Sequence, residues 1–286
     1  MLQPKIILIA GPTASGKSAL ALEIARGSNG TIINADAMQV YAGLPILTAQ
    51  PSESECREVP HELYGVLDPS ESSSAGKWVA LAKRAIAKTI DNGRTPILVG
   101  GTGMYFRALL GGLADIPEIP GEVREKAEKL YAELGEEEFR RELARLDPES
   151  ARRLEKNDRQ RLIRAYEVAA HTGKPIIHWQ KNTPENYLEF FSIEPHLLLP
   201  ERTTLYAACD RRFAGMIEQG AVDEVRAFLA RNLNAELPAM KTLGVREIGA
   251  YLRNEMPLDE SIAKAQQATR NYAKRQMTWF RNQWAF

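Results

Sequence analysis

Short apolar runs alternate with amphipathic segments along the first third of the chain. Segments at Ala19–Arg26 and Ala75–Asn92 have the periodicity of helices. The apolar runs are bounded by glycine, proline and polar residues, which is typical of buried strands, and they are Lys5–Ala10, Gly30–Asn34 and Thr95–Gly100. Strands that alternate with helices predict an α/β fold, with a parallel sheet covered by helices.

The pattern changes near Ala114. Leu113–Pro120 contains two prolines and predicts a linker. Gly121–Thr172 is heavily charged, its apolar residues recur at helical spacing, and helix starts are expected at Pro148 and at Asn157–Asp158. These features predict a bundle of helices that is inserted into the α/β fold.

The sheet pattern returns after this helical segment. Ile193–Leu199 predicts one more strand that rejoins the sheet. Three helices are expected after it, at Thr203–Gln219, Val222–Arg231 and Ser261–Trp279. We therefore expect a catalytic core of residues 1–114 and 196–286, with an inserted all-helical subdomain at residues 115–195.

The composition bears on the cellular compartment of the protein, but it does not identify a binding partner. The 286 residues include 37 basic and 37 acidic side chains, so the formal charge of zero does not by itself indicate nucleic acid. The two cysteines, Cys56 and Cys209, are far apart, which favours a reducing compartment without disulfides. The histidines lack metal-ligand spacing, and no apolar run is long enough to span a bilayer. We expect a monomeric cytoplasmic enzyme with no membrane partner.

The C-terminal segment departs from this charge balance. After Glu260 it has no acidic residue and five basic ones. Arg270, Lys274 and Arg281 fall near one helical face, with aromatic residues between them. This face is either a solvated helix with an aromatic packing stripe or a basic surface for phosphate groups.

The candidate chemistry begins at Gly11–Ser18, where GPTASGKS matches the phosphate-loop pattern G-x-x-x-x-G-K-[ST]. The loop lies between a predicted strand and a predicted helix, as the motif requires. Its glycines allow several N–H groups to face one anion, Lys17 adds a positive charge, and Ser18 offers a hydroxyl to Mg²⁺. The loop predicts a di- or triphosphate ligand, and a nucleotide-dependent kinase is the first interpretation.

Two further strand ends carry candidate groups. Asp36 follows the second strand, where it acts on an acceptor or a magnesium-bound water, or serves as the N-cap of a following helix. Gly100–Gly103 is not a dinucleotide fingerprint, because Phe106 replaces the third glycine, but it predicts a tight turn that brings the Thr102 hydroxyl to a ligand. Because ligands lie beyond the carboxyl ends of parallel strands, we expect these groups to converge with the phosphate loop.

Five motifs together resemble the tRNA dimethylallyltransferases, the bacterial enzymes that add an isopentenyl group to a tRNA adenine. In chain order they are GPTASGKS (Gly11–Ser18), INADAMQVY (Ile33–Tyr41), GGTGMYFRAL (Gly100–Leu109), NDRQRLIRAYEV (Asn157–Val168) and ATRNYAKRQMTWFR (Ala268–Arg281). The resemblance covers essentially the whole chain and implies a P-loop kinase-like fold. It implies that the loop holds the diphosphate of dimethylallyl diphosphate, that Mg²⁺ is the cofactor, and that the partner is the tRNA anticodon stem-loop. The acceptor is then the exocyclic N6 of the adenosine immediately 3′ of the anticodon.

The resemblance also implies roles for individual residues. Asp36 matches the proposed general base, and the other catalytic positions are Thr13, Lys17 and Thr102. Diphosphate binding is expected from Gly11, Pro12, Thr13, Ala14, Ser15, Gly16, Lys17, Ser18 and Arg212, and metal binding from Ser18. Contacts with tRNA are expected from Asp36, Ala37, Met38, Gln39, Thr102, Arg124, Gln160, Arg161, Leu162, Ile163, Arg164, Lys241, Gly244 and Arg246.

The chain departs from the family pattern at two positions. Ala37 stands where the family usually has serine, so one hydroxyl near the base contact is missing. Ala208 stands where the family has an arginine implicated in diphosphate binding, whereas Arg212 matches a second arginine. We expect weaker affinity for the diphosphate than in a typical member.

Three other functions compete with this interpretation. An adenylate isopentenyltransferase would use the same diphosphate with a free nucleotide, but the inserted helices and QRLIR (Gln160–Arg164) argue against it. An ATP-dependent small-molecule kinase would bind ATP tightly and transfer phosphate. A nucleic-acid-binding protein whose loop only senses a nucleotide would keep its activity without Asp36 or Lys17.

Overall fold

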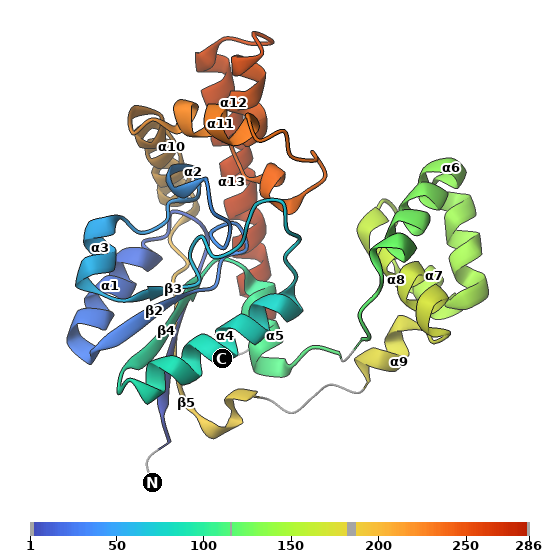
Figure 1. Ribbon diagram of the computed structural model, residues 1–286, viewed down its shortest axis with the longest axis horizontal. Coiled ribbons are helices and arrows are strands. Elements are labelled where there is room, and N and C mark those ends of the chain that lie inside the picture. The colour runs from blue at the N-terminus through green and yellow to red at the C-terminus, as the bar shows by residue number, and fades with distance from the viewer. Residues whose placement is uncertain (1–2, 115, 182–186, 285–286) are drawn as a thin grey trace. The chain divides into compact units, whose positions relative to one another are not determined.

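The computed structural model describes residues 3–114, 116–181 and 187–284 (Figure 1). A five-stranded sheet has the order β3-β2-β4-β1-β5, and every pair in it is parallel. The strands are β1 (Lys5–Ala10), β2 (Gly30–Asn34), β3 (His61–Glu62), β4 (Thr95–Gly100) and β5 (Ser192–Leu197). The sheet confirms the predicted α/β class. Pairing of Ile7 with Ile97 and of Lys5 with Ser192 places β1 between β4 and β5.

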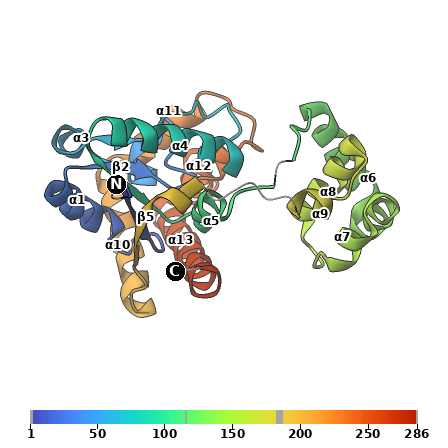
Figure 2. The same cartoon turned by 90° about the horizontal axis from the view of Figure 1, so that it is seen from below.

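Helices cover both faces of this sheet. Alternate residues of a strand point to opposite faces, so Ile7, Ile9 and Val99 share one face. They pack against Ala21 and Ala25 of α1 (Lys17–Ser28). On the other face, α4 (Ala75–Asp91) contacts β2 and β4, and Figure 2 shows α1 and α4 on opposite sides of the sheet. The predicted helices of this region are confirmed, because their apolar stripes match these two faces.

The C-terminal helices pack together beside the sheet. Cys209 of α10 (Arg202–Glu218) and Ala273 and Met277 of α13 (Leu258–Gln283) share a buried cluster. The remaining helical elements of this unit contain nine residues or fewer. The bounds are α2 (Pro45–Thr48), α3 (Glu53–Glu58), α5 (Gly103–Gly111), η1 (Tyr187–Phe190), α10 (Arg202–Glu218), α11 (Ala221–Leu229), η2 (Pro238–Lys241), α12 (Val245–Leu252) and α13 (Leu258–Gln283).

A second compact unit lies between α5 and η1 in the chain. It contains α6 (Gly121–Leu146), α7 (Pro148–Arg153), α8 (Arg159–Thr172) and α9 (Ile176–Gln180). Asp147 and Asp158 cap α7 and α8 by accepting hydrogen bonds from Ser150 N and Arg161 N, which explains the helix starts expected there. Phe139, Leu143 and Leu162 are among the residues of its own buried core.

The chain divides into residues 1–110 with 188–286, and residues 111–187. The boundary expected at 195 is corrected to 187, because the strand that begins at Ser192 pairs with β1 in the sheet. The other expected boundary, Asp115, lies outside the described residues. Over the described part of the chain, the structure has no helix that combines the length and the apolar content needed to cross a bilayer.

Candidate functional site

The phosphate loop joins the end of β1 to the start of α1. Gly16 adopts a left-handed conformation, with φ of 90°, which a side chain would strain, and Lys17 begins the helix. Among the described side chains none caps this helix, and its first turn contains no acidic residue. The first N–H groups and the positive end of the helix dipole are therefore available to an anion.

Two cationic side chains meet at this loop from different parts of the chain. Lys17 Nζ donates to Pro12 O at 2.5 Å, and Arg212 Nη2, from α10, donates to Thr13 Oγ1 at 2.5 Å. Burial lowers the pKa of Lys17 to about 8, although the charge of Asp36 opposes this shift, and burial also lowers the pKa of Arg212. Like charges repel, so two half-buried cations that meet at one loop favour a negatively charged ligand.

Asp36 is fixed in a turn just beyond β2. Its Oδ1 accepts a hydrogen bond from Met38 N at 2.9 Å, and residues 37–40 form a turn and not a helix. The alternative that Asp36 caps a helix is therefore excluded. Asn34, which is fully buried, accepts a hydrogen bond from Asp36 N at 2.8 Å and donates to Asp36 O at 3.0 Å. This asparagine holds the backbone of the carboxylate, and the sequence analysis missed it.

The glycine turn after β4 lies against the same segment. Thr102 Oγ1 accepts a hydrogen bond from Ala37 N at 2.9 Å, and Thr102 N donates to Ala35 O at 3.3 Å. A Cβ on Gly100 would lie 2.0 Å from Ala35 O, so only glycine permits this approach. The structure thus brings Thr102 to Asp36, as the strand-end argument predicted.

The negative charge of Asp36 acts on three tyrosines from separate elements. Burial raises the pKa of Tyr64, Tyr105 and Tyr272, and the negative charge of Asp36 adds to each rise; for Tyr105 the value is about 12. Tyr272 also forms a side-chain hydrogen bond with Thr102. The ring of Tyr105 stacks on Trp78 with centroids 4.3 Å apart. The raised pKa values keep all three phenols neutral near pH 7, and the sequence analysis did not single out these tyrosines.

Some of the residues expected to contact tRNA in the first unit are exposed, and others hold the backbone through hydrogen bonds. Met38 Sδ accepts from Thr242 Oγ1 at 3.6 Å, so the turn at Asp36 lies beside the segment Lys241–Arg246. Lys241 and Arg246 are exposed. Gln39 uses its amide nitrogen to hold Thr48 O and Ala49 O, both at 2.9 Å.

Gly244 lies in the packed part of the same segment. It is buried, with φ of 93°, and a Cβ there would lie 2.9 Å from Leu47 and 3.1 Å from Phe213. Its tight packing against α2 and α10 makes it a residue that shapes the backbone, and its contact with tRNA stays a prediction.

The expected contacts of the second unit also divide into two groups. Leu162 and Ile163 are buried in the core of this unit, and their contact with tRNA stays a prediction. Arg124 and Arg164 both pair with buried Glu167, with N–O distances of 3.3 Å and 2.5 Å. Gln160 and Arg161 are exposed. Glu167 therefore holds two arginines together at the surface of this unit.

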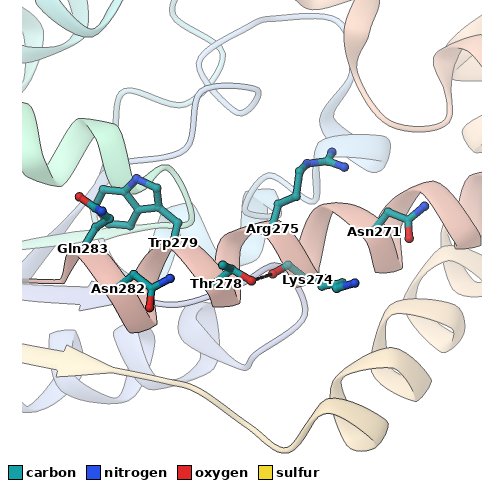
Figure 3. A pocket seen from close by; sticks show the side chains of 7 residues that line it. All are labelled: Asn271, Lys274, Arg275, Thr278, Trp279, Asn282 and Gln283. Carbon is teal, nitrogen blue, oxygen red and sulfur yellow. Dashed lines mark hydrogen bonds between the residues drawn. The ribbon is translucent and has the colours of Figure 1, made fainter. Parts of the chain in front are cut away.

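One face of α13 lines a pocket of about 550 Å³ (Figure 3). Figure 3 shows the Trp279 ring and the Arg275 and Lys274 side chains along this helix. The lining residues are Asn271, Lys274, Arg275, Thr278, Trp279, Asn282 and Gln283. By contrast, Arg270 is paired with Asp210 at 2.5 Å, so the three basic residues expected on one face do not act as one surface.

The described residues contain no cluster of three or more acidic, histidine or cysteine side chains that could hold a metal ion. Ser18, in the first turn of α1, is exposed. A single hydroxyl suits a metal ion that takes most of its oxygens from a bound phosphate ligand.

The fold and the site define a phosphate-loop α/β protein in which an anion site adjoins a carboxylate. The IPP transferase family matches residues 39–283, and the isopentenyl transferase family matches residues 4–64. A tRNA dimethylallyltransferase from a Caulobacter species is 53% identical over 279 residues, covering 98% of this chain and 90% of that protein. The tRNA dimethylallyltransferase of Phenylobacterium zucineum is 50% identical over 284 residues, covering 99% and 92%.

Solved structures agree with these relatives. A eukaryotic dimethylallyltransferase acting on tRNA has a TM-score of 0.82 and 27% identity, covering 97% of this chain and 70% of that one. The tRNA delta(2)-isopentenylpyrophosphate transferase of Staphylococcus epidermidis has a TM-score of 0.67 and 32% identity, covering 98% and 90%. The chain belongs to the tRNA dimethylallyltransferase family, a family of prenyl-transferring enzymes.

Proposed function

We propose that this enzyme transfers the dimethylallyl group of dimethylallyl diphosphate to the exocyclic N6 of the adenosine immediately 3′ of the anticodon in tRNA. The observation that carries the proposal is the convergence of Lys17 and Arg212 on the phosphate loop beside Asp36. An anion held by the two cations would present its organic end toward the carboxylate. The membership of the family supports the same reaction.

The residues fit the electronic demands of this reaction. The adenine amine is a weak nucleophile, because its lone pair is delocalised into the ring. Its attack forms a bond from N6 to the first carbon of the allyl group, while the bond from that carbon to oxygen breaks and its electron pair leaves with diphosphate. Lys17, Arg212 and the N–H groups of α1 stabilise the charge on the leaving group. Asp36 accepts the proton lost from N6 and passes it to solvent.

Thr13 contributes its hydroxyl to this site. Because Thr13 Oγ1 accepts a hydrogen bond from Arg212, the proton of the same hydroxyl remains to donate to a diphosphate oxygen. The other loop residues expected to bind diphosphate contribute backbone N–H groups, except Pro12, which has none. Mg²⁺ would be held by the Ser18 hydroxyl together with diphosphate oxygens, and it would neutralise part of the negative charge.

Exposed basic residues of both units are proposed to hold the tRNA. Lys241 and Arg246 lie in the segment next to the turn of Asp36, and Arg124, Arg161 and Arg164 lie on the second unit. The target adenine must leave the anticodon stack to reach Asp36, as enzymes that act on bases require. Aromatic side chains suit the binding of an unstacked base.

The proposal is tested by transfer of labelled dimethylallyl from its diphosphate, with Mg²⁺, to an unmodified anticodon stem-loop. A stem-loop with guanosine in place of the target adenosine serves as the control. Label on the adenosine stem-loop alone supports the proposal. Label on free AMP would identify an adenylate isopentenyltransferase, and phosphate transfer from ATP without prenyl transfer would identify a kinase.

The lowered pKa of Lys17 predicts how the reaction depends on pH. Lys17 is charged below pH 8 and loses its charge above it, so the diphosphate loses a partner as the pH rises. We expect the KM for dimethylallyl diphosphate to rise roughly tenfold between pH 8 and pH 9.5. Arginine keeps its charge over this range, so a Lys17→Arg variant should show a flat profile. An equal rise in that variant would contradict the assignment to Lys17.

The missing arginine at position 208 gives a second prediction. Ala208 is half-buried on α10, one helical turn before Arg212, and residues four apart lie on the same helix face. An Ala208→Arg variant should therefore lower the KM for dimethylallyl diphosphate, by about tenfold if the new cation reaches the diphosphate. Ala207→Arg, at the exposed neighbouring position, is the matched control. An unchanged KM in Ala208→Arg would show that the site has no shortage of positive charge.

A further inference from the structure

Gln276 of α13 connects two loops that lie far from it in sequence. Its Oε1 accepts a hydrogen bond from Thr13 N at 2.8 Å, and its Nε2 donates to Gly101 O at 2.8 Å. The residue is only 6% exposed, so both bonds lie largely out of solvent. The two partners also fix the amide orientation, because an N–H must face the oxygen and a carbonyl must face the nitrogen.

Packing leaves little freedom for this side chain. A Cβ on Gly101 would lie 2.2 Å from Gln276 Nε2, so the glycine is required for the amide to reach the turn. Neighbouring residues of α13, Ala273 and Met277, lie in the buried cluster with Cys209 of α10. The helix that carries Gln276 is therefore anchored on both sides of it.

The consequence for the phosphate loop is specific. Thr13 N–H is taken by Gln276 and is not free to bind an anion, while Thr13 Oγ1 is held by Arg212. Two helices from the C-terminal third of the chain thus fix the orientation of one loop residue. The hydroxyl proton of Thr13 is left as its free donor.

The second bond of Gln276 holds the glycine turn that follows β4. Gly101 precedes Thr102, whose hydroxyl accepts from Ala37 N next to Asp36. Gln276 therefore spans the loop proposed to hold the diphosphate and the turn that positions the proposed base. The two loops are therefore connected through one side chain.

We infer that Gln276 is a positioning residue that sets the phosphate loop in its anion-binding conformation and holds it in register with the segment of Asp36. The inference rests on the proposed function for its effect on prenyl transfer, but its effect on anion binding is independent of the acceptor. Small displacements of reacting groups have large kinetic effects, so loss of the two bonds should be measurable in both.

The experiment compares Gln276→Met with Gln267→Met in the otherwise complete enzyme. Methionine has a similar length but lacks the oxygen and the N–H of the amide. Gln267 is an exposed glutamine of the same helix, and its side chain forms hydrogen bonds with Asn271 and Arg270. Binding of inorganic pyrophosphate is measured by titration calorimetry, and KM and kcat are measured for prenyl transfer. We expect Gln276→Met to weaken pyrophosphate binding and to raise the KM for dimethylallyl diphosphate by about tenfold or more, with the KM for the stem-loop within about twofold. Gln267→Met should match the wild type.

A second variant separates positioning from a general loss of packing. In Gln276→Glu, a protonated carboxyl restores both bonds, since its O–H donates to Gly101 O and its carbonyl accepts from Thr13 N. The ionised form loses the donor and adds a negative charge beside the anion site. Pyrophosphate affinity, taken relative to wild type at each pH, should therefore recover as the pH falls from 8 to 5, and it should not recover in Gln276→Met.

The outcomes are distinguishable. Wild-type pyrophosphate affinity in folded Gln276→Met, or a pH-independent affinity ratio in Gln276→Glu, overturns the inference. If Gln276→Met does not fold, the pH series of Gln276→Glu decides alone. If the wild type transfers no prenyl group to RNA but the variants still lose pyrophosphate affinity as described, the proposed function fails and the positioning role stands.

Discussion

Replacing Lys17 by methionine should lower kcat/KM for dimethylallyl diphosphate by about a thousandfold, because the change removes a positive charge from the leaving group in a partly desolvated site. The ammonium group donates to Pro12 O in the free enzyme, and its loss leaves Arg212 as the remaining cation at the loop among those described here. Steady-state kinetics with the labelled diphosphate measures the effect. Pyrophosphate binding should weaken in parallel.

The control for this prediction is Lys88→Met on α4. Lys88 is an exposed lysine that pairs with Glu62 at 2.7 Å, so its loss changes the net charge by the same amount without entering the site. We expect activity within about twofold of wild type, as for other surface substitutions. A Lys17→Met enzyme that keeps more than a tenth of wild-type kcat/KM would exclude Lys17 from the diphosphate site.

The second large effect is expected from Asp36→Asn. Asparagine keeps an oxygen that accepts from Met38 N, so the turn is preserved while the basic carboxylate is lost. General-base catalysis typically contributes a factor of about 10² to 10⁴, so kcat should fall by roughly that amount. Pyrophosphate binding should be unchanged or tighter, because a negative charge near Lys17 has been removed. A fall in kcat without a loss of pyrophosphate affinity is the result expected for a general base.

Asp223→Asn, at an exposed position on α11, is the matched control for Asp36→Asn. It should leave both kcat and pyrophosphate binding at wild-type values. If kcat of Asp36→Asn stays within a few-fold of wild type, solvent takes the N6 proton and Asp36 has only a structural role in its turn.

The parts of the fold that depend on local pattern could be predicted from the sequence. Lys5–Ala10, Gly30–Asn34 and Thr95–Gly100 are strands with the predicted bounds, because each is a short apolar run between turn residues. The two-residue strand β3 was not predicted, since His61–Glu62 has no periodic pattern to detect. The helix α12 was also missed, because it is short and follows an irregular segment.

In the candidate site, too, some residues could be predicted from the sequence and others could not. Lys17, Ser18 and Asp36 could be singled out because a motif or a strand end marks them. Asn34, Tyr272 and Gln276 act through contacts with residues that are distant in sequence or through side-chain bonds to the backbone, which no local pattern encodes. The sequence also did not mark Leu162 and Ile163 as core residues, because they lie within a motif that was interpreted as one functional block.

The pairing of β1 with β5 has a consequence for synthesis on the ribosome. Lys5 pairs with Ser192, so β1 lacks one of its two neighbours until the inserted helical unit has been made. The two side chains that bind Thr13 of the phosphate loop are synthesised later still: Arg212 on α10 and Gln276 near the end of the chain. Synthesis proceeds at roughly 5–20 residues per second, so many seconds pass between the synthesis of the loop and that of the side chains that hold it. A nascent chain released before α13 should therefore carry the complete phosphate-loop motif and still bind pyrophosphate poorly.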